Sequence, residues 1–371
     1  MERYFLGSNT KSGFRGFYGE ATADLDRVYL LKGGAGTGKS SLIKKVLKRG
    51  VDCGYKCESW HCSGDPNSLD GVCLSDLGVA VIDATSPHAV EPSIPVVKDG
   101  IINLLQYADR HKLAGYRTVL EKLANNKKEC YMCGYEHLNI AYCHLTQNKR
   151  CVSSSMNDGL IVSRARDFAL DILSELRCLN DAIESEEYDS DNTSMAEKIE
   201  GQSACKCSVS KRFFRAITPD GIVMYEDHLL NKNIWYIKGE VASVDLFLKT
   251  ALDVIRERSE DKLPVTIFYN PLDIGIIDGF MVGDTAVVCE INKTDGAMVY
   301  DLRWYEGDFD KYAVSRAKMK MKEEIDVAVD YFSKARSVHL GIERYYISAM
   351  DFDGINCMTD KLLEEIFEGK R

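Results

Sequence analysis

One glycine-rich segment constrains the fold of this chain more than any other feature. Residues 33–40 read Gly-Gly-Ala-Gly-Thr-Gly-Lys-Ser and fit the pattern G-x-x-x-x-G-K-[ST]. The apolar run 27–32 before it is typical of a buried strand, and the apolar residues after it, within 41–48, recur at helical spacing. A strand, a glycine turn and a helix in this order predict an α/β fold with a phosphate-binding loop at the end of the strand.

The residue types in this loop indicate how a phosphate would be held. Glycines let successive backbone N–H groups converge on phosphate oxygens, and the following helix directs its positive end to the same point. We expect Lys39 to neutralise the β- and γ-phosphates of a nucleotide and the Ser40 hydroxyl to ligate Mg²⁺. The predicted nucleotide-binding residues are Gly33, Gly34, Ala35, Gly36, Thr37, Gly38, Lys39, Ser40 and Ser41. The alternative is a glycine-rich turn without a ligand.

Such a loop needs a carboxylate on the metal side, and Asp83 is the candidate. It closes the apolar run 79–82, as the acid at the end of a neighbouring strand would. Together with Ser40 it is predicted to hold Mg²⁺. The alternative is an ordinary strand-end aspartate that caps a turn.

Two polar loops supply candidates for positioning a water or an acceptor. The loop after the expected strand 57–62 would lie at the nucleotide edge of a parallel sheet, so His61 and Asp65 are predicted catalytic residues beside Lys39 and Asp83. Further candidates for the same role are Asp70, His88 and Glu91. Each of these residue types is more often a turn or capping residue, and no acid directly beside Asp83 is an obvious general base.

The second half of the sequence repeats the first. The matching segments are Arg3-Tyr4-Phe5 with Arg212-Phe213-Phe214, Thr10 and Gly13 with Thr218 and Gly221, Lys32-Gly33 with Lys238-Gly239, Leu69-Asp70-Gly71 with Ile277-Asp278-Gly279, and the strand 79–83 with 286–290. Two copies of one architecture follow. We place the domains at 1–207 and 208–371 and expect the two copies to pack against each other.

The second copy has lost the residues that hold a phosphate. Aligned without gaps, Val244 stands at the second glycine, Asp245 at the lysine and Leu246 at the Mg²⁺ hydroxyl. A β-branched residue disfavours the turn, and a carboxylate there would repel a triphosphate. We therefore expect nucleotide binding by the first copy only.

Helical segments are expected after the last strand of each copy. Residues 98–125 and 130–147, and then 312–337 and 340–346, are predicted to form a helical hairpin beside each sheet. The acidic, aromatic-poor stretch 184–203 is typical of an exposed linker. The predicted fold class is thus α/β, with two three-layer domains in tandem, each carrying a helical hairpin, the second one degenerate.

Composition limits the partners and the compartment. A net charge of −10 without a long basic patch disfavours nucleic acid and anionic lipid. The first residues lack the pattern of a signal peptide, and no apolar run approaches the roughly 20 residues of a membrane span, so we expect a cytoplasmic protein without membrane contact. The 13 cysteines are then expected to be mostly reduced core thiols. A zinc site at Cys130-x-x-Cys133 with Cys143-His144 is the less favoured alternative.

Several of these segments resemble one known family. The segments are 4–10, the loop 33–40, His61 to Gly71, Asp83 to Pro92, and Ala349-Met350-Asp351-Phe352. Together they resemble an uncharacterised family of tandem P-loop ATPase-like proteins from spore-forming and related anaerobic bacteria. The resemblance covers essentially the whole chain and implies a two-domain P-loop fold that binds ATP rather than GTP. The family often has a better loop in its second copy, from which this chain departs at residues 244–246.

These observations leave three hypotheses for function. The first is a Mg²⁺-dependent ATPase or nucleotide switch that uses Lys39, Ser40 and Asp83. The second is a phosphotransferase that passes the γ-phosphoryl group to a small acceptor held by the loop 61–71. The third is a scaffold that binds nucleotide without turnover.

Overall fold

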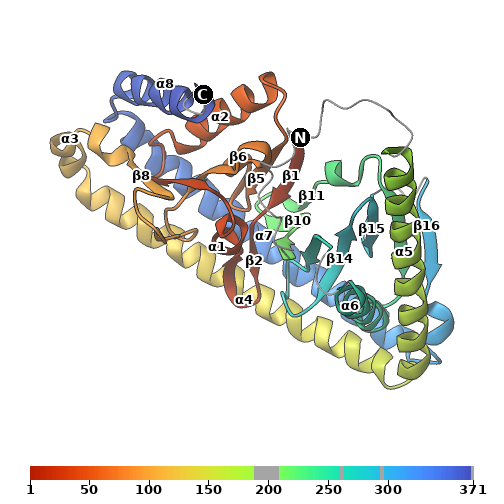
Figure 1. The fold of residues 1–371 in the computed structure, drawn as a ribbon. Helices are drawn as coiled ribbons and strands as arrows, with labels where there is room; N and C mark the ends of the chain where they lie inside the picture. Colours follow the sequence, from red (N-terminus) through yellow and green to blue (C-terminus); the bar gives the residue numbers. More distant parts are fainter. Residues whose placement is uncertain (188–208, 260–262, 293–295, 369–371) are drawn as a thin grey trace.

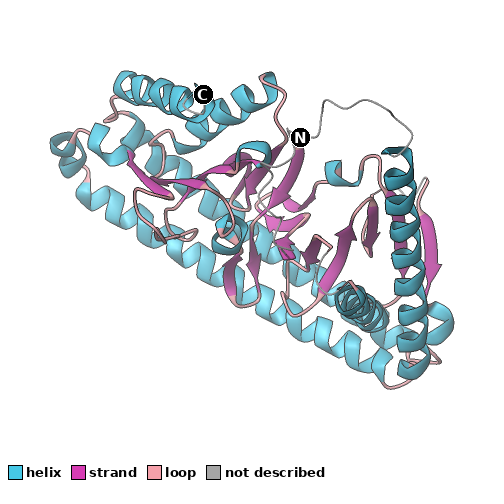
Figure 2. Cartoon of the chain, in the orientation of Figure 1, coloured by secondary structure: helices cyan, strands magenta, loops and turns pink. Residues whose placement is uncertain are grey.

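The structure, a computed structural model, describes residues 1–187, 209–259, 263–292 and 296–368 (Figure 1). It is a mixed α/β protein with two six-stranded sheets, as Figure 2 shows by element type. In the first half the strands are β1 (Glu2–Phe5), β2 (Gly7–Thr10), β3 (Gly13–Gly16), β4 (Arg27–Lys32), β5 (Cys57–Cys62), β6 (Asp65–Leu74), β7 (Val79–Asp83) and β8 (Asp99–Asn103), and the α-helices are α1 (Tyr18–Thr22), α2 (Lys39–Asp52), α3 (Arg110–Gly115), α4 (Arg117–Ser153) and α5 (Asp158–Glu187). In the second half they are β9 (Val209–Arg212), β10 (Arg215–Thr218), β11 (Gly221–Met224), β12 (Asn233–Lys238), β13 (Val265–Tyr269), β14 (Ile277–Val282), β15 (Thr285–Val288), β16 (Met298–Asp301), α6 (Val241–Arg258), α7 (Lys311–Ile347) and α8 (Phe352–Glu368).

The two sheets share one topology. The first has the strand order β1-β5-β6-β7-β4-β8, and the second has β9-β13-β14-β15-β12-β16. In each sheet one strand, β6 or β14, is antiparallel to both neighbours, while the other pairs are parallel. A two-stranded hairpin, β2-β3 or β10-β11, follows the first strand of each half. The repetition expected from the sequence is therefore present in the order and direction of every strand.

Strand pairing also corrects the alignment of the two halves. Gly71 of β6 pairs with Ile82, and Gly279 of β14 pairs with Val288. Ile82 and Val288 therefore occupy equivalent positions in the two sheets. The next residues along the chain, Asp83 and Cys289, are then equivalent as well. The sequence alignment, which places Glu290 opposite Asp83, is wrong by one residue. Alternating apolar strands allow such a slip because neighbouring positions look alike until the pairing partner is known.

Each sheet carries α-helices on one face and shares an apolar cluster with the other half on the opposite face. Tyr29 and Leu31 of β4 face α2 and α8, whereas Val28 and Leu30 join a cluster that contains Phe268 of the second sheet. Among the residues that the structure describes, the second face of each sheet is therefore not covered by the separate helical layer that a three-layer domain would have. Strands that are apolar on both sides bury their second face against the other half instead of under a second helical layer.

The predicted helical hairpins are wrong. Residues 117–153 and 311–347 each form one unbroken helix of 37 residues, and residues 99–103 form strand β8. The two long helices, α4 and α7, run antiparallel along one side of the molecule (Figure 1), with His137 Nδ1 2.6 Å from Glu324 Oε2. Packing between them stabilises both helices across positions that read as breaks in the sequence.

The long helices carry the chain from one half to the other and back. Helix α5, which belongs to the first half of the sequence, packs on α6 and the second sheet through Ile161 and Phe168. Helix α8 returns to the first sheet, where Ile355 and Leu362 pack beside α2. The two halves are thus interlocked. A backbone bridge joins them as well, since Phe5 and Phe213 exchange two hydrogen bonds of 2.9 Å.

Other sequence predictions have mixed outcomes. Residues 184–187 of the predicted linker belong to α5, and the rest of that stretch lies outside the described residues. Of the cysteines that the structure describes, two are buried (Cys57 and Cys73), three are exposed (Cys53, Cys143 and Cys357) and five are half-buried (Cys62, Cys130, Cys133, Cys151 and Cys289). The expectation of mostly core thiols is therefore confirmed only for Cys57 and Cys73. Over the described ranges, no helix has the length and apolar character needed to cross a bilayer.

Candidate functional site

The glycine loop lies between the end of β4 and the start of α2. Gly36 and Gly38 have φ values of +68° and +92°, a region that glycine enters at little cost. Gly38 is the N-cap of α2, so Lys39 and Ser40 lie in the first turn of that helix. The buried Thr37 hydroxyl donates a 2.9 Å hydrogen bond to the carbonyl of Gly34 and holds the loop closed on itself. The strand, the glycine turn and the helix expected from the sequence are therefore present in this order.

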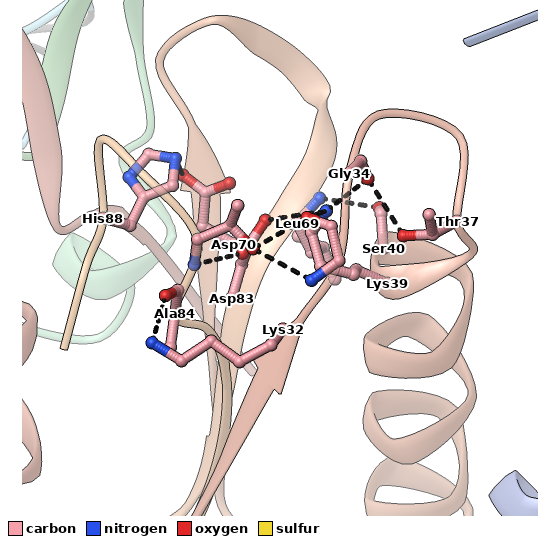
Figure 3. Close-up of polar contacts among 12 residues, drawn as sticks. Lys32, Gly34, Thr37, Lys39, Ser40, Leu69, Asp70, Asp83, Ala84 and His88 are labelled. Carbon is pink, nitrogen blue, oxygen red and sulfur yellow. Dashed lines mark hydrogen bonds and ion pairs between the residues drawn. The ribbon is translucent and has the colours of Figure 1, made fainter. Parts of the chain in front are cut away.

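Three predicted site residues lie close together at this loop (Figure 3). Lys39 Nζ donates to the carbonyls of Gly33 at 3.0 Å and Gly34 at 2.7 Å, and it lies 3.6 Å from Asp83 Oδ2. Asp83 ends β7, which runs parallel to β4, so the sheet brings its carboxylate to the same edge as the loop. Ser40 Oγ accepts a 3.0 Å hydrogen bond from the Leu69 N–H. A cation, a hydroxyl and a carboxylate thus converge at one helix N-terminus.

The C-terminal part of the chain covers this loop. A Cβ atom placed on Gly36 would lie 2.8 Å from the carbonyl oxygen of Glu343 in α7. One placed on Gly34 would lie 3.2 Å from the Tyr346 ring, and one on Gly38 would meet Phe352 of α8 at 3.6 Å. Close packing and backbone conformation therefore both require glycine at position 36, whereas the contact at Gly34 is only tight and that at Gly38 is an ordinary van der Waals contact.

Titratable side chains of the two long helices also reach the loop. Lys127 Nζ of α4 lies 3.2 Å from His339 Nδ1 of α7, and His339 Nε2 lies 3.5 Å from Glu343 Oε1. The hydrogen bond from His339 lowers the pKa of Glu343, and the Gly36 N–H and the charge of Lys39 act in the same direction against burial. Burial lowers the pKa of Lys127, and the like charge of Lys39 adds to this effect.

His61 and Asp65 lie elsewhere. His61 Nδ1 is 2.8 Å from the Pro66 carbonyl and 3.0 Å from the Tyr225 hydroxyl, between the two halves. Burial is the main reason that its pKa is lowered. Asp65 Oδ1 accepts a 3.3 Å hydrogen bond from the Asn67 N–H in its own turn. Within the described ranges, the structure shows no contact of either side chain with Lys39, Ser40 or Asp83. Two strands separate β5, which carries His61, from β4, and Asp65 is the first residue of β6.

The further candidates divide into two groups. Glu91 is exposed and pairs with Lys32 at 3.3 Å. Asp70 and His88 are buried next to Asp83, with His88 Nε2 3.4 Å from Asp70 Oδ2 (Figure 3). Burial raises the pKa of Asp70, with the charge of His88 opposing and that of Asp83 adding. Cys62 lies beside this pair.

The corresponding region of the second half contains no such loop. Helix α6 begins at Val241, only three residues after the last residue of β12, so Val244 and Asp245 are part of a helix rather than of a turn. Asp245 Oδ2 binds Lys149 Nζ of α4 and Lys249 Nζ, both at 3.0 Å. The residues that would form the loop instead form the first turn of α6. The ion pair between Asp245 and Lys149 lies at this end of the helix.

Sequence reasoning missed Lys127, His339 and Glu343. They are distant from the motif in the chain, and only the pairing of α4 with α7 brings them to the loop. It also missed Cys62 as a member of the cluster with Asp70 and His88, since the three residues follow no compact metal-ligand spacing. The Cys130-x-x-Cys133 segment contributes nothing to that cluster.

Comparison of the chain with family models, with curated proteins and with solved structures finds no match.

Proposed function

We propose that the chain binds Mg²⁺-ATP at the loop 33–40 of its first half and hydrolyses it, with the second half responding to the bound nucleotide. One observation carries this proposal. The ammonium of Lys39 lies at the N-terminus of α2 within 3.6 Å of the Asp83 carboxylate, on a loop whose glycines take left-handed conformations. A helix N-terminus with converging N–H groups and a lysine favours a phosphate, and serine and aspartate oxygens favour a hard cation.

The residues have separate roles in this proposal. Lys39, which donates to two loop carbonyls, turns to the β- and γ-phosphate oxygens as a point charge. Ser40 and Asp83 would hold Mg²⁺, which would supply positive charge to balance the negative charge of the phosphates. Lys127 supplies a second cation near Lys39, and its burial keeps that charge poorly screened. Preference for adenine rests on the family resemblance alone.

The second half is proposed not to bind nucleotide in this way. Its helix α6 starts where the loop would be, and Cys289 replaces the metal-binding carboxylate. The contact between Glu343 and the loop gives that half a direct means of responding to what the loop holds.

Calorimetry with the full chain, Mg²⁺ and a non-hydrolysable ATP analogue tests the binding step. We expect about one site per chain, and Lys39→Ala should weaken binding about 100-fold, equivalent to roughly 3 kcal/mol for the loss of a charge-assisted contact. Lys48→Ala is the matched control, because Lys48 lies on the same helix and is exposed. Two equivalent sites, or equal binding by the Lys39→Ala variant, would contradict the proposal.

Phosphate release separates the three hypotheses. Release from ATP without an added acceptor, lost in Lys39→Ala, supports hydrolysis. Release or transfer that begins only when a pool of small metabolites is added supports a phosphotransferase. Binding without turnover in either assay favours a nucleotide-binding scaffold.

A further inference from the structure

A cluster of three different side chains, two of them buried and one half-buried, lies near the glycine loop. Cys62 ends β5, Asp70 lies in β6, and His88 lies in the loop after β7. One possible ligand atom from each, a sulfur, a carboxylate oxygen and a ring nitrogen, lies within 4.8 Å of the other two. The side chains of His88 and Asp70 are 8% and 5% exposed. The Tyr18 hydroxyl donates a 2.9 Å hydrogen bond to Asp70 Oδ2.

The His88 ring is held only loosely by the protein around it. In the described part of the chain, Nδ1 of His88 makes no hydrogen bond, although it is enclosed. Nε2 is the ring nitrogen that faces Asp70 and would bind an ion held by the cluster. Neither histidine nitrogen therefore has a short, strong protein hydrogen bond, since Nε2 is 3.4 Å from its nearest acidic oxygen.

The second half shows how the same carboxylate is neutralised where no ligand is needed. Asp278 corresponds to Asp70, because the two aspartates directly precede the equivalent glycines of β14 and β6. These glycines pair with β15 and β7. Arg215 binds Asp278 through Nε at 2.6 Å and Nη2 at 3.0 Å, and Asn270 donates a further hydrogen bond of 2.9 Å. A guanidinium with two parallel hydrogen bonds satisfies a buried carboxylate fully.

The first half lacks both of these partners. The hairpin registers place Gly7 at the position of Arg215, and the strand registers place Cys62 at the position of Asn270. Over the described residues, no lysine or arginine forms an ion pair with Asp70. The arginine has thus been replaced by glycine and the amide by a thiol, which removes the built-in cation and adds a metal ligand.

We propose that Cys62, Asp70 and His88 bind a divalent transition-metal ion of the zinc type. Thiolate and imidazole ligands favour such ions, whereas Mg²⁺ prefers oxygen alone. Tetrahedral bonds of about 2.0–2.3 Å place ligand atoms roughly 3.3–3.8 Å apart, so the three side chains close by about 1 Å on binding. The ion neutralises the thiolate and the carboxylate together, as Arg215 does for Asp278.

Three protein ligands leave one coordination position for water, which is the pattern of an accessible rather than a closed zinc site. A surface pocket of about 190 Å³ is lined in part by Tyr18 and His88, so one side of the cluster lies close to solvent. This proposal is independent of nucleotide binding, because none of its ligands is Lys39, Ser40 or Asp83.

Cobalt(II) added to the metal-stripped full chain, without nucleotide, tests the proposal. We expect about one Co²⁺ per chain, with the visible absorption of a tetrahedral site and a cobalt–thiolate charge-transfer band, and displacement by Zn²⁺. Cys62→Ser should remove the thiolate band, and His88→Gln should weaken binding at least tenfold. Circular dichroism tests whether each variant folds. If one of the two variants does not fold, the other one alone is compared with the unmodified protein.

Controls make the result specific. Cys73→Ser, at a buried thiol of the neighbouring strand β6, and Cys130→Ser, at the Cys-x-x-Cys segment, should both keep the full signal. Lys39→Ala should also keep it, so failure of the nucleotide proposal and failure of this one are distinguishable. No binding, a band that survives Cys62→Ser, or a band lost in Cys130→Ser would overturn the metal site.

Discussion

Glu343 of α7 lies against Gly36 in the glycine loop of the opposite half of the chain, so that a Cβ atom on Gly36 would meet the Glu343 carbonyl at 2.8 Å. The Gly36 N–H and the positive charge of Lys39 both lower the pKa of the Glu343 carboxyl group. A carboxylate therefore stands beside the N–H groups and the lysine that a phosphate would use. Lys149, at the corresponding position four residues before the end of α4, faces Asp245 instead, with the charges reversed.

Removing the charge of Glu343 should strengthen nucleotide binding. Glu343→Gln keeps the shape of the side chain but removes a negative charge near the phosphates, and we expect the affinity for the Mg²⁺-ATP analogue to rise about three- to tenfold. Glu323→Gln, on an exposed part of the same helix, is the control and should leave the affinity unchanged. Weaker binding by Glu343→Gln would show that the carboxylate assists the nucleotide rather than competing with it.

Packing of α7 on the loop predicts unequal effects of alanine at two glycines. Gly36→Ala must adopt φ +68° and also meets Glu343, so we expect a loss of about 2–4 kcal/mol in the free energy of unfolding. Gly54→Ala also has a positive φ, +81°, but nothing lies within 4 Å of its Cβ, and about 1 kcal/mol should be lost. Denaturant unfolding measures both. Equal losses of unfolding free energy in the two variants would mean that α7 does not pack closely against Gly36.

The ion pair that replaces the ligand cluster in the second half should be important for stability. Arg215→Ala leaves Asp278, whose side chain is 1% exposed, without its cation, and should lower the free energy of unfolding by about 3–5 kcal/mol. Arg336→Ala breaks a more exposed pair with Asp220 and should cost at most about 1 kcal/mol. Comparable losses in the two variants would show that the buried pair of Arg215 and Asp278 contributes no more to stability than the exposed pair does.

His228 should make the protein less stable in acid. It is enclosed by aromatic rings, both ring nitrogens lack partners in the described structure, and burial lowers its pKa to about 3, with Asp227 opposing. The unfolded chain binds a proton near pH 6.5 and the folded chain does not, so stability present above that pH is lost as the pH falls towards 3.

This linkage predicts a loss of about 2 kcal/mol between pH 7 and pH 5 from His228 alone. His228→Phe keeps an aromatic ring beside Tyr4 and Phe268 and removes the titration, so its free energy of unfolding should fall less over the same range. Urea unfolding at the two pH values is the measurement. The same pH dependence in both proteins would show that His228 is not the group responsible.

The sequence by itself determined the local features of the site. The order of strand, glycine loop and helix follows from side chains within a short segment, and Lys39, Ser40 and Asp83 lie together because parallel strands end at one edge of a sheet. The internal repeat was also visible, since buried strands keep their apolar pattern, although its register at Asp83 needed the observed pairing to be placed correctly.

Only the tertiary structure decided what surrounds that loop. Local patterning is the same for a helical hairpin and for one long helix that crosses to the other half, because the packing partner, not the sequence period, stabilises the continuous helix. That crossing brings Lys127, His339 and Glu343 to Gly36. The separation of His61 from Lys39, and the approach of Cys62 to Asp70 and His88, likewise depend on strand order, which contacts between distant residues select.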